Sequence, residues 1–226
     1  MLGSLFIGYF VIITFVYTIF DWLIILGLTY LCLLPAFISN ASMTFAGKFP
    51  FKLIPIDGGR MWRGSDERIF GDNKTWNGIF IGIIFGFGIS MITILIYPPV
   101  ADFAVFQFST FPGGGLKLFS LEDILYFMEI RGDNFGFFLI RTLIMCTAAP
   151  IGDLIGSFGK RRFGKGEGSQ VLMVDQLDFI LFSILIVYPI FPLHILFIIF
   201  VSISTPLVAI FGNVVAYYGG VKDVPW

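Results

Sequence analysis

The sequence predicts an all-α, polytopic integral membrane protein with about five transmembrane helices and two basic cytoplasmic loops. Of its 226 residues, 57% are apolar and 13% are charged, whereas a soluble domain has about 45–50% apolar and about 25% charged residues. The apolar residues gather in five blocks, each long enough to cross roughly 30 Å of hydrocarbon. The near balance of 14 basic and 15 acidic residues excludes a basic nucleic-acid binder.

The predicted spans form a single integral membrane domain over residues 1–226. They cover residues of about 5–38, 78–97, 135–158, 171–190 and 193–218. The first block is long enough for one tilted helix or for a helix bent near Asp21, and the sequence leaves both open. Because a carboxylate inside a span should face protein or water, Asp21 either has a functional role or marks an unwound point.

Two loops between the spans carry most of the basic residues. The loop over about 39–77 contains six of them, and the loop over about 159–170 contains four. The segment over about 98–134 contains only Lys117 and Arg131 beside five acidic residues. Since basic loops stay in the cytoplasm, we expect both basic loops and the C-terminus to be cytoplasmic. The N-terminus and the segment 98–134 should then lie outside the cell membrane.

Glycines recur every four residues in two of the spans. Gly78, Gly82 and Gly86 lie in the second span, and Gly152 and Gly156 lie in the third. Small residues at this spacing let two helix backbones approach closely. We therefore expect close helix packing at both stretches.

The third and fourth spans carry charged side chains where they meet the second basic loop. Asp153 and Ser157 are four residues apart and share a helix face, which Lys160 continues. Asp175 and Asp178 share a face of the next span. Carboxylates without cysteine or histidine partners suit Mg²⁺, and lysine and arginine suit phosphate. The pattern favours a metal and phosphate site over a solvated basic loop with salt bridges at the helix ends.

The first basic loop leads into the second span through another candidate site. Gly71 permits a tight turn, and Lys74 and Thr75 stand directly before the span. A lysine and a hydroxyl at a helix N-terminus favour anion binding, although the spacing is not that of a P-loop. A boundary signal at the membrane surface explains these residues equally well.

Together these segments resemble the signature of the CTP:phosphatidate cytidylyltransferases. The resemblance rests on residues 152–161, followed by the two aspartates of residues 175–178 on the next span. Residues 74–78 resemble the Lys-Thr-x-x-Gly element that stands upstream in the same family. Residues 55–58 and 70–76 look like the archaeal branch of that family, the CDP-archaeol synthases.

The chain departs from the bacterial and eukaryotic signature at two places. Residues 164–170 contain no histidine, and residues 175–178 contain no arginine. Both departures are compatible with the archaeal branch.

The resemblance implies a membrane-embedded, Mg²⁺-dependent nucleotidyltransferase of phospholipid biosynthesis, with Mn²⁺ as a substitute metal. It would transfer CMP from CTP to an unsaturated archaeal ether-lipid phosphate, 2,3-di-O-geranylgeranylglycerol 1-phosphate, and release pyrophosphate. The implied partners are CTP, this polyprenyl glycerol phosphate lipid and the bilayer. The resemblance assigns metal binding to Asp153, Asp175 and Asp178. It assigns catalysis to these three aspartates and to Lys160. Substrate binding is assigned to Lys74, Thr75, Ser157, Arg161, Arg162, Lys165, Arg60, Arg68, Asp57 and Asp72.

Two other functions fit parts of the sequence. In a small transporter or channel, Asp21, Arg141, Asp153 and Asp178 would line an ion path, although most of the charge clusters at one membrane face. A CDP-alcohol phosphotransferase would also bind a nucleotide and Mg²⁺. Residues 57–60 match only the start of the motif of that family.

Overall fold

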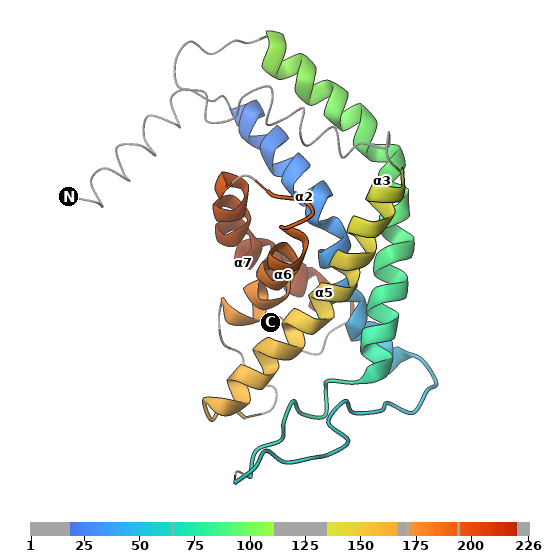
Figure 1. The fold of residues 1–226 in the computed structure, drawn as a ribbon, viewed down its shortest axis with the longest axis vertical. Helices are drawn as coiled ribbons and strands as arrows, with labels where there is room; N and C mark the ends of the chain where they lie inside the picture. The colour runs from blue at the N-terminus through green and yellow to red at the C-terminus, as the bar shows by residue number, and fades with distance from the viewer. Residues whose placement is uncertain are drawn as a thin grey trace, which may run out of the picture. The chain divides into compact units, whose positions relative to one another are not determined.

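The computed structural model describes residues 19–64, 66–110, 135–166, 171, 173–193 and 195–220. Its helices are α2 (Ile19–Ser42), the 3-10 helix η1 (Met43–Lys48), α3 (Trp76–Thr110), α5 (Phe135–Arg162), α6 (Val174–Val187) and α7 (Ile195–Tyr218) (Figure 1). Within these residues, β-structure is limited to two isolated bridges, one between Pro55 and Thr75 and one between Met61 and Arg68. The predicted all-α fold class is confirmed.

Four of the described helical segments are long and apolar enough to cross a membrane. They are Leu26–Lys48, Trp76–Ile96, Phe135–Arg162 and Phe197–Tyr218. The chain is therefore a multi-pass membrane protein. Helix α6 has 14 residues and rises about 21 Å, which is less than the roughly 30 Å of the hydrocarbon core. The boundaries of the five predicted spans and their sidedness stay predictions.

Two helices differ in extent from the apolar blocks. Helix α2 is regular from Ile19 onward, so the backbone is not unwound at Asp21; residues 1–18 lie outside the described part. Helix α3 continues through residues 98–99, where two prolines predict its end, to Thr110. The membrane-spanning part of this helix, Trp76–Ile96, ends just before the prolines.

Contacts within the chain divide it into two compact units. One comprises Met1–Cys32 and Ile92–Phe138, and the other comprises Leu33–Met91 and Leu139–Trp226. All the site residues discussed below belong to the second unit. That the chain forms one integral membrane domain stays a prediction.

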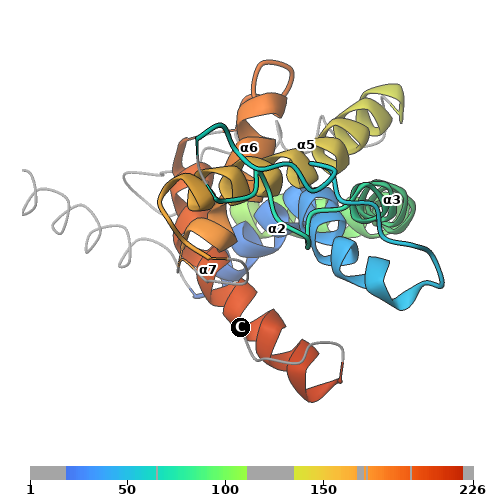
Figure 2. The same cartoon turned by 90° about the horizontal axis from the view of Figure 1, so that it is seen from below.

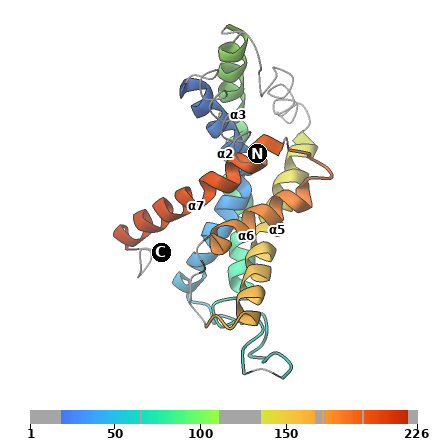
Figure 3. The ribbon, with the colours of Figure 1, turned by 90° about the vertical axis from the view of Figure 1, so that its left-hand side faces the viewer.

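Glycine contacts bring helices of the second unit together, as the four-residue spacing predicts. A Cβ atom added at Gly82 of α3 would lie 2.8 Å from the backbone oxygen of Ser39 on α2. One added at Gly152 of α5 would lie 2.7 Å from the backbone oxygen of Asp178 on α6. Helix α3 thus packs directly on α2, and α5 packs on α6 (Figure 2). Helix α7 crosses α2 (Figure 3), and the two line a common pocket.

A hydrogen bond between α2 and α5 lies next to a proline in α5. Pro150 has no N–H group, so it cannot bond the backbone oxygen of Cys146 four residues earlier. The hydroxyl of Ser39 donates to that oxygen at 2.7 Å. In an apolar surrounding this bond satisfies a group that would otherwise be costly to bury. It fixes α2 against α5 about two turns before Asp153.

Candidate functional site

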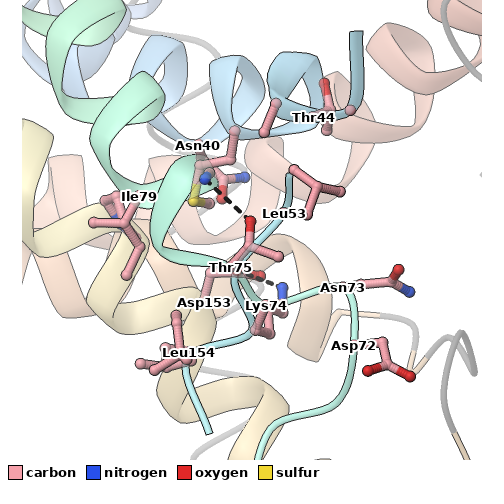
Figure 4. Close-up of a pocket in the computed structure, with 16 residues that line it drawn as sticks. Asn40, Thr44, Leu53, Asp72, Asn73, Lys74, Thr75, Ile79, Asp153 and Leu154 are labelled. Carbon is pink, nitrogen blue, oxygen red and sulfur yellow. Dashed lines mark hydrogen bonds and ion pairs between the residues drawn. The ribbon is translucent and has the colours of Figure 1, made fainter. Parts of the chain in front are cut away.

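A pocket of about 410 Å³ lies where the end of α2 and η1 meet the start of α3 and the middle of α5. Lys74, from the loop before α3, and Asp153, from α5, both line it (Figure 4). Their side chains form an ion pair, with Lys74 Nζ 2.5 Å from Asp153 Oδ2. The two side chains are 25% and 19% exposed, so an incoming anion or cation can reach either of them.

Backbone bonds to the chain around Pro55 hold Lys74 at the start of α3. Ile56 N–H donates to the oxygen of Lys74, and Trp76 N–H donates to the oxygen of Ile54, both at 2.9 Å. The Thr75 hydroxyl accepts a bond from Gly78 N–H at 3.1 Å and so caps α3. With two N–H groups of the first turn occupied, the lysine charge and the helix dipole remain to attract an anion.

Asp57 organises the rest of the first basic loop. Its carboxylate is fully buried, pairs with Arg68 and accepts backbone N–H bonds from Gly59, Phe70 and Gly71 at 3.0 to 3.2 Å. Burial alone would raise the pKa of Asp57, but Arg68 and the three N–H donors lower it to about 2. Gly71 has φ = +104°, a conformation that favours glycine. This turn immediately precedes the residues that line the pocket.

A second ion pair joins the ends of α5 and α6. Lys160 Nζ lies 2.5 Å from Asp175 Oδ1, and the other oxygen of Asp175 accepts Val171 N–H at 3.0 Å. The carboxylate therefore satisfies a backbone donor at the start of α6. The two helices predicted to carry the charged residues do meet at these residues.

Asp178 is the most enclosed of the three predicted metal ligands. One carboxylate oxygen accepts Phe179 N–H at 2.6 Å, while Oδ2 is buried with no hydrogen-bond donor among the described residues. The carboxylate lies directly against Gly156 and within electrostatic reach of Asp153, Lys74 and Lys160. A buried carboxylate oxygen without a donor is a group that a bound cation or water would satisfy.

The three aspartates do not form a complete metal cage. Within the part of the chain that the structure describes, no three Asp, Glu, His or Cys side chains lie close enough to hold a metal ion by themselves. Mg²⁺ typically takes one or two carboxylates together with substrate phosphates and water. The carboxylates of Asp153 and Asp178 fit that arrangement.

Several predicted substrate-binding residues lie away from the pocket. Ser157 is buried, and Arg161 is buried with its guanidinium bonded to the backbone oxygen of Lys165. Arg162 donates to the backbone oxygen of Arg68 at 2.8 Å. Of the predicted residues, the pocket is lined by Asp72, Lys74, Thr75 and Asp153. Arg60 and Lys165 are exposed, and Arg68 pairs with both Asp57 and Asp72.

The end of α2 and η1 also contribute to the pocket, and no sequence pattern predicted this. Asn40 and Thr44 line it from the end of the first apolar block (Figure 4). Both are polar and four residues apart, a spacing that puts them on one helical face. This pair of polar residues, which follows the first apolar block, is the sequence feature that could have indicated a contribution to the pocket.

The apolar helices define a polytopic membrane protein. Its pocket, which combines a lysine, a carboxylate and a capped helix N-terminus, is a site suited to phosphate groups. The chain matches the CarS-like CDP-archaeol synthase family over residues 19–145 and 114–226. It therefore belongs to the CDP-archaeol synthase family.

Individual relatives agree with this assignment. The chain is 32% identical over 203 residues to a CDP-archaeol synthase of Methanococcus aeolicus. The aligned segment covers 88% of this chain and 95% of that one. It is 35% identical over 196 residues to a CDP-archaeol synthase of Thermococcus gammatolerans, and the aligned segment covers 86% of this chain and 92% of that one.

A solved structure shares the fold. It is described as "Structural insight into an intramembrane enzyme for archaeal membrane lipids biosynthesis" and has a TM-score of 0.57 and 21% sequence identity, covering 82% of this chain and 92% of that one. The family confirms the resemblance seen in the sequence. The chain is a membrane enzyme of the cytidylyltransferase type, and the transporter and phosphotransferase alternatives lack comparable support.

Proposed function

We propose that this enzyme transfers CMP from CTP to the phosphate of an archaeal ether lipid, giving CDP-archaeol and pyrophosphate. A phosphate oxygen of the lipid attacks the α-phosphorus of CTP, and the bond between the α-phosphorus and the oxygen leading to the β-phosphate breaks. The lipid phosphate is already a nucleophile, so catalysis requires positioning and charge stabilisation more than a strong base. The observation that carries the proposal is the pairing of Lys74 with Asp153 in a pocket at the start of α3.

Lys74 is the residue best placed to bind the triphosphate. Its ammonium group is one-quarter exposed at the pocket wall, and the positive end of the α3 dipole adds to its charge. Lys160 lies within electrostatic reach of Asp178 and is held by Asp175. We assign Lys160 to the phosphates and Asp175 to orienting Lys160.

Asp153 and Asp178 are the carboxylates that would hold Mg²⁺ together with phosphate oxygens. The buried, donor-free oxygen of Asp178 supports this assignment, because an unpaired buried carboxylate oxygen is costly unless a cation reaches it. When bound, Mg²⁺ supplies charge neutralisation for the triphosphate and the leaving pyrophosphate. Lys74 would exchange Asp153 for phosphate as the substrates enter.

The hydrocarbon chains of the lipid have an adjoining apolar pocket. It measures about 420 Å³ and is lined by residues of α2, α6 and α7, including Phe37, Phe179 and Val208. Asn40 and Thr44 line both pockets. This adjacency supports a lipid whose phosphate enters the polar pocket while the chain segments next to the phosphate contact the apolar one.

The Asp153→Asn substitution tests the central assignment. With purified protein, labelled CTP and several lipid phosphates, we expect turnover to fall at least 100-fold, because the variant loses a metal ligand and the partner of Lys74. Binding of Mn²⁺, followed by electron paramagnetic resonance in the presence of CTP, should weaken in parallel. EDTA should abolish the wild-type activity, and added Mg²⁺ should restore it.

Asp66→Asn is the matched control, since Asp66 is an exposed carboxylate of the first basic loop. It should retain wild-type turnover and Mn²⁺ binding. Wild-type activity of Asp153→Asn, or full activity after EDTA treatment, would contradict the metal assignment. Turnover with CTP but none of the archaeal ether-lipid phosphates would contradict the proposed substrate.

A further inference from the structure

The first basic loop is fastened to the end of α5 by a group of side chains that the reaction chemistry does not use. The guanidinium carbon of Arg162 lies 4.7 Å from the ring centre of Trp62 and 5.1 Å from that of Phe158. The two rings meet edge to face at 5.2 Å. Phe158 and Arg162 are four residues apart on α5 and so share a face, and Trp62 comes from the loop. We call Trp62, Phe158 and Arg162 the aromatic clamp.

The aromatic clamp joins α5 to the hydrogen-bonded core of the loop. Arg162 also donates to the backbone oxygen of Arg68 at 2.8 Å. Phe70 lies 6.1 Å from Phe158 between ring centres, and its N–H group bonds Asp57. Phe158 and Arg162 of α5 therefore contact the loop at three places: Trp62, Arg68 and Phe70.

The same loop core determines where Lys74 lies. Arg68 pairs with Asp57 and Asp72, and Asp57 fixes the N–H groups of Phe70 and Gly71. Gly71 begins the turn that ends at Lys74, since Lys74 N–H donates to the oxygen of Gly71 at 3.3 Å. A continuous set of contacts thus runs from the clamp to the ammonium group beside Asp153.

We propose that Trp62 and Phe158 are positioning residues for CTP, which act by holding the first basic loop against α5 so that Lys74 and Asp153 face the same pocket. Neither side chain carries a charge that binds phosphate, and neither lines the pocket. Their effect reaches the substrate only through the loop. This inference rests on the proposed function for its CTP readout but not for its structural readout.

The test compares Trp62→Leu and Phe158→Leu with Phe163→Leu. Phe163 is 84% exposed at the same end of α5 and belongs to no described aromatic contact, so it controls for loss of a phenylalanine there. In the two clamp variants we expect the KM for CTP to rise about 3- to 10-fold, as the loss of a partly desolvated cation–π contact implies. We expect kcat and the KM for the lipid to change less than twofold. Trp62→Phe keeps an aromatic ring and should restore most of the CTP affinity.

Amide hydrogen exchange of residues 57–74 in the substrate-free protein gives the second readout. It should accelerate about 3- to 10-fold in Trp62→Leu and Phe158→Leu and stay unchanged in Phe163→Leu. If both clamp variants match Phe163→Leu in exchange and in KM for CTP, the inference is wrong. A fall in kcat at unchanged KM would also overturn it, because the clamp would then act on the chemical step.

The two readouts separate this inference from the proposed function. If the wild-type protein fails to turn over CTP, the proposed function fails, while hydrogen exchange still decides whether the clamp holds the loop. Should Phe158→Leu fail to purify in a monodisperse form, the two Trp62 variants decide alone, because Trp62 is 42% exposed on a loop and tolerates substitution.

Discussion

Asp57 shows how one buried carboxylate stabilises an otherwise irregular loop. Its pKa falls from the usual 3.8 to about 2, so the ionised form is worth about 2 kcal/mol to the folded loop. Because the folded-state pKa is the lower one, this contribution is complete above about pH 4 and is lost as the pH falls from about 4 to about 2. Hydrogen exchange of residues 57–74, measured from pH 5 to pH 2, should reveal progressive loss of protection in this window.

The Asp57→Asn variant should lose this pH dependence and be less protected already at pH 7. Among the described residues, the substitution leaves the half-buried Arg68 side chain with Asp72 as its one ion-pair partner, which typically costs about 1–3 kcal/mol. Asp66→Asn, which removes an exposed carboxylate nearby, should behave like the wild type. Unchanged protection at pH 7 in Asp57→Asn would show that Arg68 and the backbone donors do not depend on this charge.

At the scale of single residues, the sequence indicates where charged side chains gather better than which of them pair. The pairing of Lys160 with Asp175 was foreseeable, because both stand where adjacent spans meet the same loop. The pairing of Lys74 with Asp153 joins residues 79 positions apart, and no spacing rule connects two segments so distant. Arg162 illustrates the opposite case, because its cationic type suggests phosphate binding while its contacts are with rings and a backbone oxygen.

At the scale of helices, the crossing of α5 and α6 links packing to chemistry. The carboxylate of Asp178 lies directly against the backbone of Gly156, so a methyl group there must displace it. We expect Gly156→Ala to destabilise the protein by about 1–3 kcal/mol. It should also weaken Mn²⁺ binding in the presence of CTP, because the displaced carboxylate is a proposed metal ligand. Thermal unfolding in detergent and electron paramagnetic resonance would measure the two effects.

Gly159→Ala is the matched control for this prediction. A Cβ atom at Gly159 meets nothing within 4 Å, and alanine favours a helix over glycine by up to about 1 kcal/mol. The control should therefore be neutral or slightly stabilising. If both variants unfold and bind Mn²⁺ alike, the close approach of α5 to Asp178 has no functional consequence.

Among the helices, some features follow from sequence patterns and others do not. Glycine spacing predicted the close contacts of α3 and α5, because small residues four apart have one structural use in apolar helices. The length of α3 was not predictable, because two consecutive prolines are an ordinary stop signal for a helix, and α3 nevertheless continues past them to Thr110. The role of η1 was also hidden, since a short 3-10 helix has no periodicity to detect.

For the whole molecule, the distribution of charge agrees with the arrangement of the site. The cations and carboxylates of the proposed site come from the two basic loops and from the helices α5 and α6 beside them. The remaining exposed surface of α3 and α7 carries large apolar side chains, such as Ile84, Leu95, Leu207 and Phe211. A lipid substrate can then remain in the bilayer while only its phosphate reaches CTP. Such an arrangement of lipid and nucleotide requires both basic loops to face the cytoplasm, where CTP is found.

The side of the membrane on which the C-terminus lies depends on whether helix α6 crosses the bilayer. Five spans place the N-terminus outside and the C-terminus inside, but the 14 residues of α6 are short for a full crossing. Single cysteines replacing Arg63 and Lys165 should react with an impermeant maleimide only after the cells are permeabilised, whereas one replacing Lys117 should react in intact cells. The native Cys32 and Cys146 are buried and should stay unlabelled. A tag after Trp226 should be detected only in permeabilised cells; detection in intact cells would show that α6 does not cross and that the chain spans the membrane four times.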